Sequence, residues 1–158
     1  MIEPLDALKD RLVAAVGGGV SVEGTSLLIE RGRLLAVAAM LRDDPALQCD
    51  FLSNLCAVDF VKENYLEVVS HLFSTTLRHG PLTIRVRTGD RAHDAKMPSL
   101  VSLWRSAEYQ EREAFDLYGV VFEGHPDLRR ILMWDEFVDF PTFVGITVPK
   151  RSIEITHT

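Results

Sequence analysis

Two neighbouring segments with alternating apolar and polar residues place the strongest constraint on the fold of this chain. Residues 82–88 carry Leu, Ile and Val at 82, 84 and 86, and Thr, Arg and Arg at 83, 85 and 87. Residues 65–73 alternate in the same way, with Leu or Val at 66, 68 and 72 and polar side chains at 67 and 71. A period of two residues is that of a strand with one buried face. We therefore expect an antiparallel pair of half-buried strands, joined by a turn around residues 79–81.

Three other segments show the period of amphipathic helices. Residues 4–16 and 32–41 lie before the paired strands, and residues 98–118 lie after them. Gly17 and Gly119 follow two of these segments, where a helix commonly ends in the left-handed conformation. Helices that are segregated from an antiparallel or mixed sheet predict the α+β class, with N-terminal helices and one long helix in the C-terminal half. We expect one domain over residues 1–158, because this length is typical of a single core.

The remaining segments are less regular. Residues 20–29 predict a short strand hairpin, and residues 89–96 predict a polar loop. The segment 49–60 suits a helix and a strand about equally. After Pro126, only residues 131–134 and 145–148 show an ordered pattern. The tail 142–158 has no obvious internal packing site, and it either frays or lies along a neighbouring protein.

Composition and charge exclude several classes of function. The formal net charge is 17 − 23 = −6, which gives no general attraction for nucleic acid or an anionic membrane. No apolar run approaches the roughly 18–20 residues of a membrane span, and the N-terminus lacks the pattern of an export signal. We expect a soluble cytosolic protein. Cys49 and Cys56 cannot supply the four ligands of a thiolate metal centre, and we expect both to be buried free thiols.

Glu111 is the most informative residue of the predicted helix 98–118. A helical projection places it in the middle of the apolar face, where a carboxylate must be paired, hydrogen-bonded or protonated. Arg129 and Arg130 are the candidate partners, and the alternative is a rim position with the carboxylate in water. On a neighbouring face, Glu108, Arg112 and Asp116 have the spacing of an intrahelical ion-pair ladder. Glu113 points away from the apolar face.

Residues 78–96 have a local excess of basic side chains. A solvated sheet face explains this excess, and a charged patch that orients a partner surface is the functional alternative. The basic residues are Arg78, Arg85, Arg87, Arg91 and Lys96, against Asp90 and Asp94.

The end of the predicted helix and the following loop carry a dense motif. It begins Glu111-Arg112-Glu113 and continues through Asp116-Leu117-Tyr118. It ends with His125, Arg129, Arg130 and Ile131. In these residues the chain resembles the 30-kilodalton, or C, subunit of proton-pumping NADH:quinone oxidoreductase, respiratory complex I. Every fixed position of that family's pattern is met, and the resemblance extends over residues 50–133.

The resemblance implies an α+β structural subunit of the hydrophilic arm that holds no cofactor or metal of its own. Its implied partners are the hydrogenase-like quinone-site subunit and the subunits that carry iron–sulfur clusters. It would lie on the cytoplasmic face of the cell membrane through the complex, as a non-catalytic part of the translocase. The docking residues implied by the motif are Glu111, Arg112, Glu113, Asp116, His125, Arg129 and Arg130.

One segment departs from the family pattern. The family usually continues with a basic, proline-containing run, whereas residues 134–141 are acidic and aromatic. This departure favours the alternative that the chain serves a divergent or hydrogenase-type complex, such as a membrane-bound nickel–iron hydrogenase or a formate hydrogenlyase.

Two other classes of function remain as alternatives. A small metal- or carboxylate-dependent hydrolase would use Glu113, Asp116 and His125 as acid, base and ligand. The chain contains no HExxH sequence or nucleophile elbow, and its histidines are scattered, so this alternative is weak. The other alternative is a free-standing binding module without redox partners.

Overall fold

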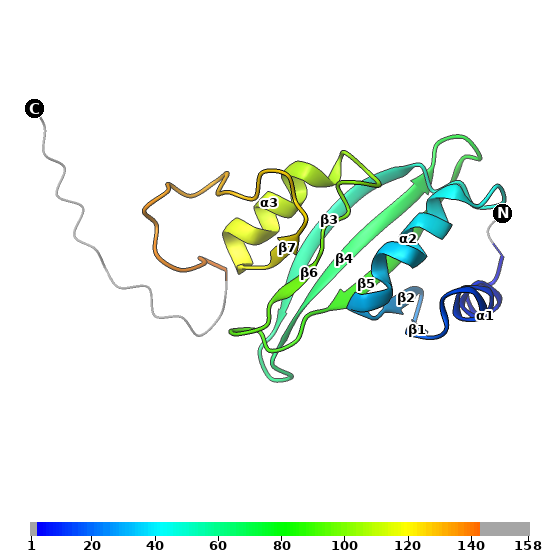
Figure 1. Cartoon of the computed structure of the whole chain (residues 1–158), viewed down its shortest axis with the longest axis horizontal. Coiled ribbons are helices and arrows are strands. Elements are labelled where there is room, and N and C mark those ends of the chain that lie inside the picture. The colour runs from blue at the N-terminus through cyan, green and yellow to red at the C-terminus, as the bar shows by residue number, and fades with distance from the viewer. Residues whose placement is uncertain (1–2, 143–158) are drawn as a thin grey trace, which may run out of the picture.

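A five-stranded mixed sheet forms the centre of the computed structural model, which describes residues 3–142 (Figure 1). The strand order is β1-β2-β5-β4-β3, and only the β2–β5 pair is parallel. The predicted pair of strands is confirmed as β4 and β5, and the predicted hairpin as β1 and β2. The five strands are β1 (Val20–Glu23), β2 (Ser26–Ile29), β3 (Phe51–Phe60), β4 (Tyr65–Ser74) and β5 (His79–Arg87).

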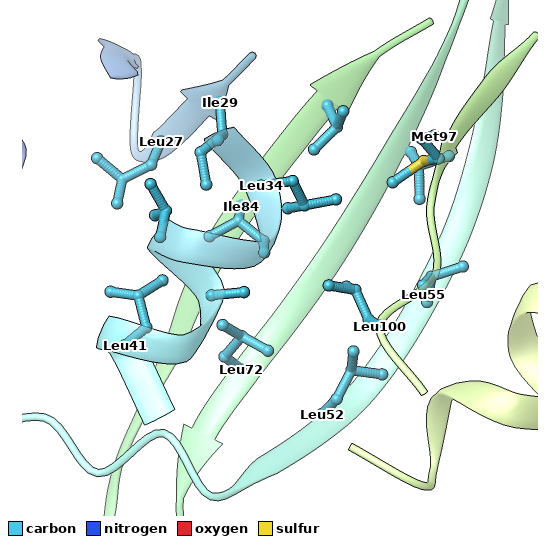
Figure 2. Packing of buried hydrophobic residues seen from close by; sticks show 14 of the residues in the cluster. Leu27, Ile29, Leu34, Leu41, Leu52, Leu55, Leu72, Ile84, Met97 and Leu100 are labelled. Atoms are coloured by element: carbon cyan, nitrogen blue, oxygen red, sulfur yellow. The ribbon is translucent and has the colours of Figure 1, made fainter. Parts of the chain in front are cut away.

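Two helices precede the long strands, as the sequence predicts. Helix α1 (Leu5–Val16) ends at Gly17 in the left-handed conformation. A 3₁₀ turn (Arg31–Arg33) leads into α2 (Leu34–Asp43), which crosses one face of the sheet (Figure 1). Between α2 and the sheet lies a core of apolar side chains, among them Leu34, Leu41 and Ile84 (Figure 2). The burial of each large aliphatic side chain contributes about 2 kcal/mol to this packing.

The second half of the chain extends the same core toward β3. Strands β6 (Lys96–Pro98) and β7 (Val121–Glu123) form a separate parallel pair, which the sequence pattern did not predict. Met97 and Leu100 belong to the same buried cluster as Leu52 and Leu55 of β3 and extend the core in that direction (Figure 2). The irregular segment between β6 and α3 (Ala107–Tyr118) therefore contributes Leu100 and Trp104 to the core, while residues 102, 105 and 106 are exposed.

The predicted helix 98–118 is wrong in its first half, because α3 begins only at Ala107. The preceding residues form turns in which the amides of Leu103 and Trp104 both bind the Leu100 carbonyl. The indole of Trp104 donates to the Cys49 carbonyl at 2.8 Å, so its ring is tied to the start of β3. Leu100 and Trp104, which are buried at helical spacing, therefore belong to a turn and not to a helix.

The ambiguous segment 49–60 is strand β3, and this changes the expectation for its cysteines. Cys49 is buried and free, as expected, but Cys56 is exposed. A strand alternates its faces, so Leu55 and Ala57 point into the core while Cys56 points out.

The turn between β4 and β5 also differs from its predicted place. Residues 79–81 begin β5, and the turn is formed by residues 75–78. The Asp50 carboxylate accepts hydrogen bonds from the amides of Thr75 and Thr76, which fixes the turn there.

The polar face of β4 contains a buried acid. Glu67 is 2% exposed and accepts hydrogen bonds from Arg85 (2.6 and 2.9 Å) and from Arg87 (3.0 Å). Glu23 on β1 pairs with the same two arginines. Arg91 forms a separate ion pair with Asp59. Much of the basic excess in residues 78–96 is therefore neutralised within the chain, so these arginines do not form a free patch for a partner.

We predict that Glu67→Ala lowers the free energy of unfolding by about 3 kcal/mol. The substitution removes the buried carboxylate that Arg85 and Arg87 share and leaves them only the more exposed Glu23 as a common partner. Urea denaturation of the full chain measures the loss. Glu63→Ala, in the exposed β3–β4 turn, is the matched control and should stay within about 0.5 kcal/mol. Equal stability of both variants would contradict the role assigned to Glu67.

Candidate functional site

The motif residues lie on α3 and on the chain that follows β7, beside the outer edge of β3 (Figure 1). Gln110 accepts a hydrogen bond from the Leu55 amide at 2.6 Å, and Ser106 donates to the Leu52 carbonyl at 2.7 Å. These side chains bind backbone groups on the outer edge of β3, which pairs with β4 along its other edge. These contacts hold α3 against the sheet, independently of the contacts that its motif residues make with the following loop.

Asp116 organises that loop. Its side chain is fully buried, and one carboxylate oxygen accepts hydrogen bonds from the amides of Ile131, Leu132 and Met133 at 2.6–3.0 Å. The other oxygen binds the Arg130 guanidinium at 2.7 Å. Burial alone would raise the pKa of Asp116, but the three amides and Arg130 hold this pKa below its ordinary value. Asp116 is therefore a charged anchor within the folded chain.

Arg112 on α3 and His125 in the loop after β7 both bind main-chain groups. The Arg112 guanidinium is buried and donates to the carbonyls of Arg129 (3.1 Å) and Arg130 (3.0 Å). The His125 ring bridges the Glu108 carbonyl and the Asp127 amide, at 2.9 and 3.0 Å. A histidine with Nε2 protonated satisfies both contacts, because Nε2 then donates and Nδ1 accepts. The predicted intrahelical ladder is wrong, since Arg112 binds carbonyl groups outside the helix and Asp116 binds Arg130.

Arg130 connects the anchor to an aromatic cluster. Its guanidinium lies over the rings of Phe137 and Phe140, at 5.6 and 5.2 Å from their centres, and donates to the Asp139 carbonyl at 2.8 Å. Phe140 also meets Phe115 of α3 edge to face. A Cβ at position 119 would lie 2.6 Å from the Phe140 ring, and the backbone there has φ +82°. Both features require the glycine that ends α3.

Glu111 lies on a different side of α3 from Asp116. It is fully buried, as the helical projection predicts. The rim alternative is therefore wrong. Its partners also differ from the prediction, because the Ser99 hydroxyl and the Leu100 amide donate to its carboxyl oxygens at 2.6 Å each, and Arg129 and Arg130 bind elsewhere. Burial raises the pKa of Glu111 to about 7, and these two hydrogen bonds only partly oppose that rise.

Two predicted residues are exposed and stand outside this network. Glu113 is exposed and lines a shallow groove of about 180 Å³ between α3 and β3. Arg129 pairs at the surface with Asp127, at 2.9 Å. The structure therefore brings together Arg112, Asp116, His125 and Arg130, and leaves Glu113 and Arg129 at the surface, where they can face a neighbour.

The geometry favours a structural corner over a reaction centre. The acid and the histidine that the hydrolase alternative requires are occupied by hydrogen bonds to the backbone. Asp116 accepts from main-chain amides, and both ring nitrogens of His125 contact the backbone. Within residues 3–142, no three His, Cys, Asp or Glu side chains converge in a way that could hold a metal ion. The same residues include no helix long and apolar enough to span a bilayer.

Sequence reasoning identified the anchor residues but missed what they hold. The acidic and aromatic residues 134–141 stand out in the sequence only as a departure from a family pattern. No local period marks Phe137 and Phe140 as partners of Arg130, because this contact depends on the path of an irregular loop. The predicted ordered segment 131–134 is a bend bound to Asp116, and residues 145–148, like most of the tail 142–158, lie outside the described residues.

Comparisons with known proteins agree on one family. Residues 27–148 match the family described as "Respiratory-chain NADH dehydrogenase, 30 Kd subunit". The C subunit of the NADH-quinone oxidoreductase of Roseiflexus sp. (strain RS-1) is 42% identical over 96% of this chain and 87% of its own length.

Solved structures show the same fold. The trypsin-resistant fragment (1–134) of Nqo5 has a TM-score of 0.55 and 28% identity, covering 78% of this chain and 98% of that one. A chain of the membrane-bound sulfane sulfur reductase, an archaeal respiratory membrane complex, has a TM-score of 0.65 and covers 85% of this chain and 79% of that one. At 20% identity, this second likeness concerns the fold alone.

We predict that Glu111 makes the fold less stable as the pH rises. Its pKa is raised from 4.5 to about 7, so its stabilising contribution is complete below pH 4.5 and is lost as the pH rises through 7. The full loss corresponds to about 3 kcal/mol. Urea denaturation between pH 4.5 and 8 measures it, with Glu111→Gln as the control that removes this titration. An identical pH dependence for both proteins would show that Glu111 does not titrate in this range.

We predict that Asp116→Ala releases the loop from α3. Three amides and one guanidinium lose their shared acceptor, which costs about 3 kcal/mol of local stability. Hydrogen exchange of the amides of residues 131–133 should become much faster, while exchange in β4 stays slow. Asp127→Asn, at an exposed ion pair, is the control and should leave both rates unchanged. Unaltered exchange in Asp116→Ala would contradict the anchoring role.

Proposed function

This chain belongs to the 30-kDa subunit family of respiratory-chain NADH dehydrogenase, and from that premise we propose that it is a cofactor-free structural subunit of an NADH–quinone oxidoreductase. Its task is to dock and position the quinone-site and iron–sulfur subunits in the hydrophilic arm. It performs no bond chemistry itself, and electrons pass through neighbouring subunits.

The observation that carries this proposal is the use of the motif side chains. Arg112, Asp116 and Arg130 all bind main-chain groups that hold the segment after β7 against α3. Side chains committed in this way stabilise the shape of a surface rather than bind a substrate. Rigid, pre-arranged surfaces lower the entropic cost of association, which suits a subunit whose work is positioning.

The partners and the location follow from the same proposal. The quinone-site subunit, which is hydrogenase-like, and the iron–sulfur subunits are the proposed neighbours, without nucleic acid or a direct membrane span. The chain would lie on the cytoplasmic face of the cell membrane, attached through the complex. The exposed Glu113 and Arg129 are the charged groups proposed to meet these neighbours.

A second candidate is the equivalent subunit of a membrane-bound hydrogenase or formate hydrogenlyase-type complex. The acidic, aromatic segment 134–141 favours it, because the family's usual ending is basic. The relatives named as C subunits of NADH-quinone oxidoreductase support the respiratory complex, and their identity of about 40% over most of the chain makes it the preferred assignment.

We predict that Glu113→Ala weakens assembly while leaving the isolated fold within about 0.5 kcal/mol of the wild type. Its carboxylate is exposed and lines the α3–β3 groove, so its loss affects a neighbour more than this chain. Co-purification of the co-expressed hydrophilic subunits measures assembly, and Asp10→Ala, at an exposed position of α1, is the matched control.

Two outcomes would contradict the proposal. If the wild-type chain fails to co-purify with the other hydrophilic subunits, it is not a docking subunit. If the full chain expressed alone shows flavin or iron–sulfur absorbance, it is not free of cofactors. Unchanged co-purification of Glu113→Ala would remove only this residue from the interface.

A further inference from the structure

Large apolar side chains are exposed together on the loop that Asp116 anchors. Leu132 is 56% exposed, Trp134 57% and Val138 47%, and all three lie within seven residues of one another. Tyr109, on the neighbouring face of α3, is 63% exposed. Clustered exposure of large apolar groups marks an interaction surface, because water is a poor environment for them. We call residues 131–139 the docking loop.

The docking loop presents these side chains from a backbone with defined contacts. Asp116 binds its first three amides, and the Phe137 amide donates to the Trp134 carbonyl at 3.0 Å. The Trp134 and Phe137 rings meet edge to face at 4.8 Å. Trp134 is therefore held in a defined position against Phe137 before any partner binds. Little conformational freedom remains to be lost on binding.

Charge narrows the chemistry of the partner. The docking loop contains Asp135, Glu136 and Asp139 and no lysine or arginine. The two arginines that precede it are already engaged, Arg129 with Asp127 and Arg130 with Asp116. The apolar side chains are thus bordered by three acids, of which Asp135 also lies near enough to Arg129 to interact with it electrostatically.

We propose that the docking loop binds a neighbouring subunit of the same complex through an apolar pocket that is rimmed by lysine and arginine. This inference rests on the proposed function and assigns a chemistry to one of its interfaces. The Trp134 indole is the anchor in the pocket, since buried aromatic side chains dominate binding energy at interfaces. Asp135 and Glu136 meet the basic rim and orient the approach.

Two other occupants fit the surface less well. In a two-fold contact with a second copy of this chain, the acidic loops would face each other, and like charges would repel. An anionic lipid surface would repel the same acids. A basic-rimmed protein pocket satisfies the apolar and the acidic groups at once.

The test is affinity between the full chain and the other hydrophilic subunits of its complex, measured at low and at moderate salt. Trp134→Ala should weaken binding about thirtyfold at both salt concentrations. The charge reversal Asp135→Lys with Glu136→Lys should weaken it about tenfold at low salt and should lessen or reverse the salt dependence of the wild type. The same reversal at the exposed Asp6 and Asp10 of α1, at the opposite end of the molecule from α3 (Figure 1), is the matched control.

The outcomes separate this inference from the proposed function. Unchanged thermal unfolding of the variants shows that a loss of affinity comes from the interface. If the wild type binds and both loop variants bind equally well, the docking loop is not the contact, although the chain remains a docking subunit. If only Trp134→Ala is weaker, or the control reversal has the same effect as the loop reversal, the basic rim is wrong. If the wild type does not bind at all, the proposed function itself fails.

Discussion

The carboxylate of Asp116 joins two parts of the chain that local folding leaves apart. Helix α3 is held to β3 by Gln110 and Ser106, and the segment after β7 has no strand or helix of its own to hold its shape within the described residues. The buried carboxylate of Asp116 accepts hydrogen bonds from three successive amides and from Arg130. The Arg130 guanidinium in turn lies over the rings of Phe137 and Phe140. An irregular segment acquires a defined surface through this single charge.

Two acids five residues apart on α3 are treated in opposite ways. Asp116 meets several donors and a guanidinium, which together favour the ionised form. Glu111 meets one hydroxyl and one amide in a deeper apolar setting, and there burial dominates. The same helix therefore uses one carboxyl group as a charge and the other as a hydrogen-bonding group that links α3 to the turn at residues 99–100. The difference lies in the depth of burial and in the number of donors at each position.

The sequence predicts those parts of the fold that depend on local periodicity. The alternation in β4 and β5, the N-terminal helices and the burial of Glu111 all follow from spacing, because one face of each element must meet the core. Prediction fails where contacts distant in the chain decide the outcome. Leu100 and Trp104 sit at helical spacing but belong to a turn that Glu111 and the Cys49 carbonyl hold in place. Of the seven motif residues, four form the network that holds the loop, and their partners became visible only with the path of that loop; the four are Arg112, Asp116, His125 and Arg130.

The way α3 covers β3 has a consequence for the chain before it meets its partners. An unprotected outer strand of ten residues is a template for cross-β stacking between identical molecules. Here side chains of α3 occupy backbone groups of that strand, and the strand at the other side of the sheet, β1, has only four residues. The sheet therefore offers few free edge groups for pairing with other copies of the chain before it assembles with its partners.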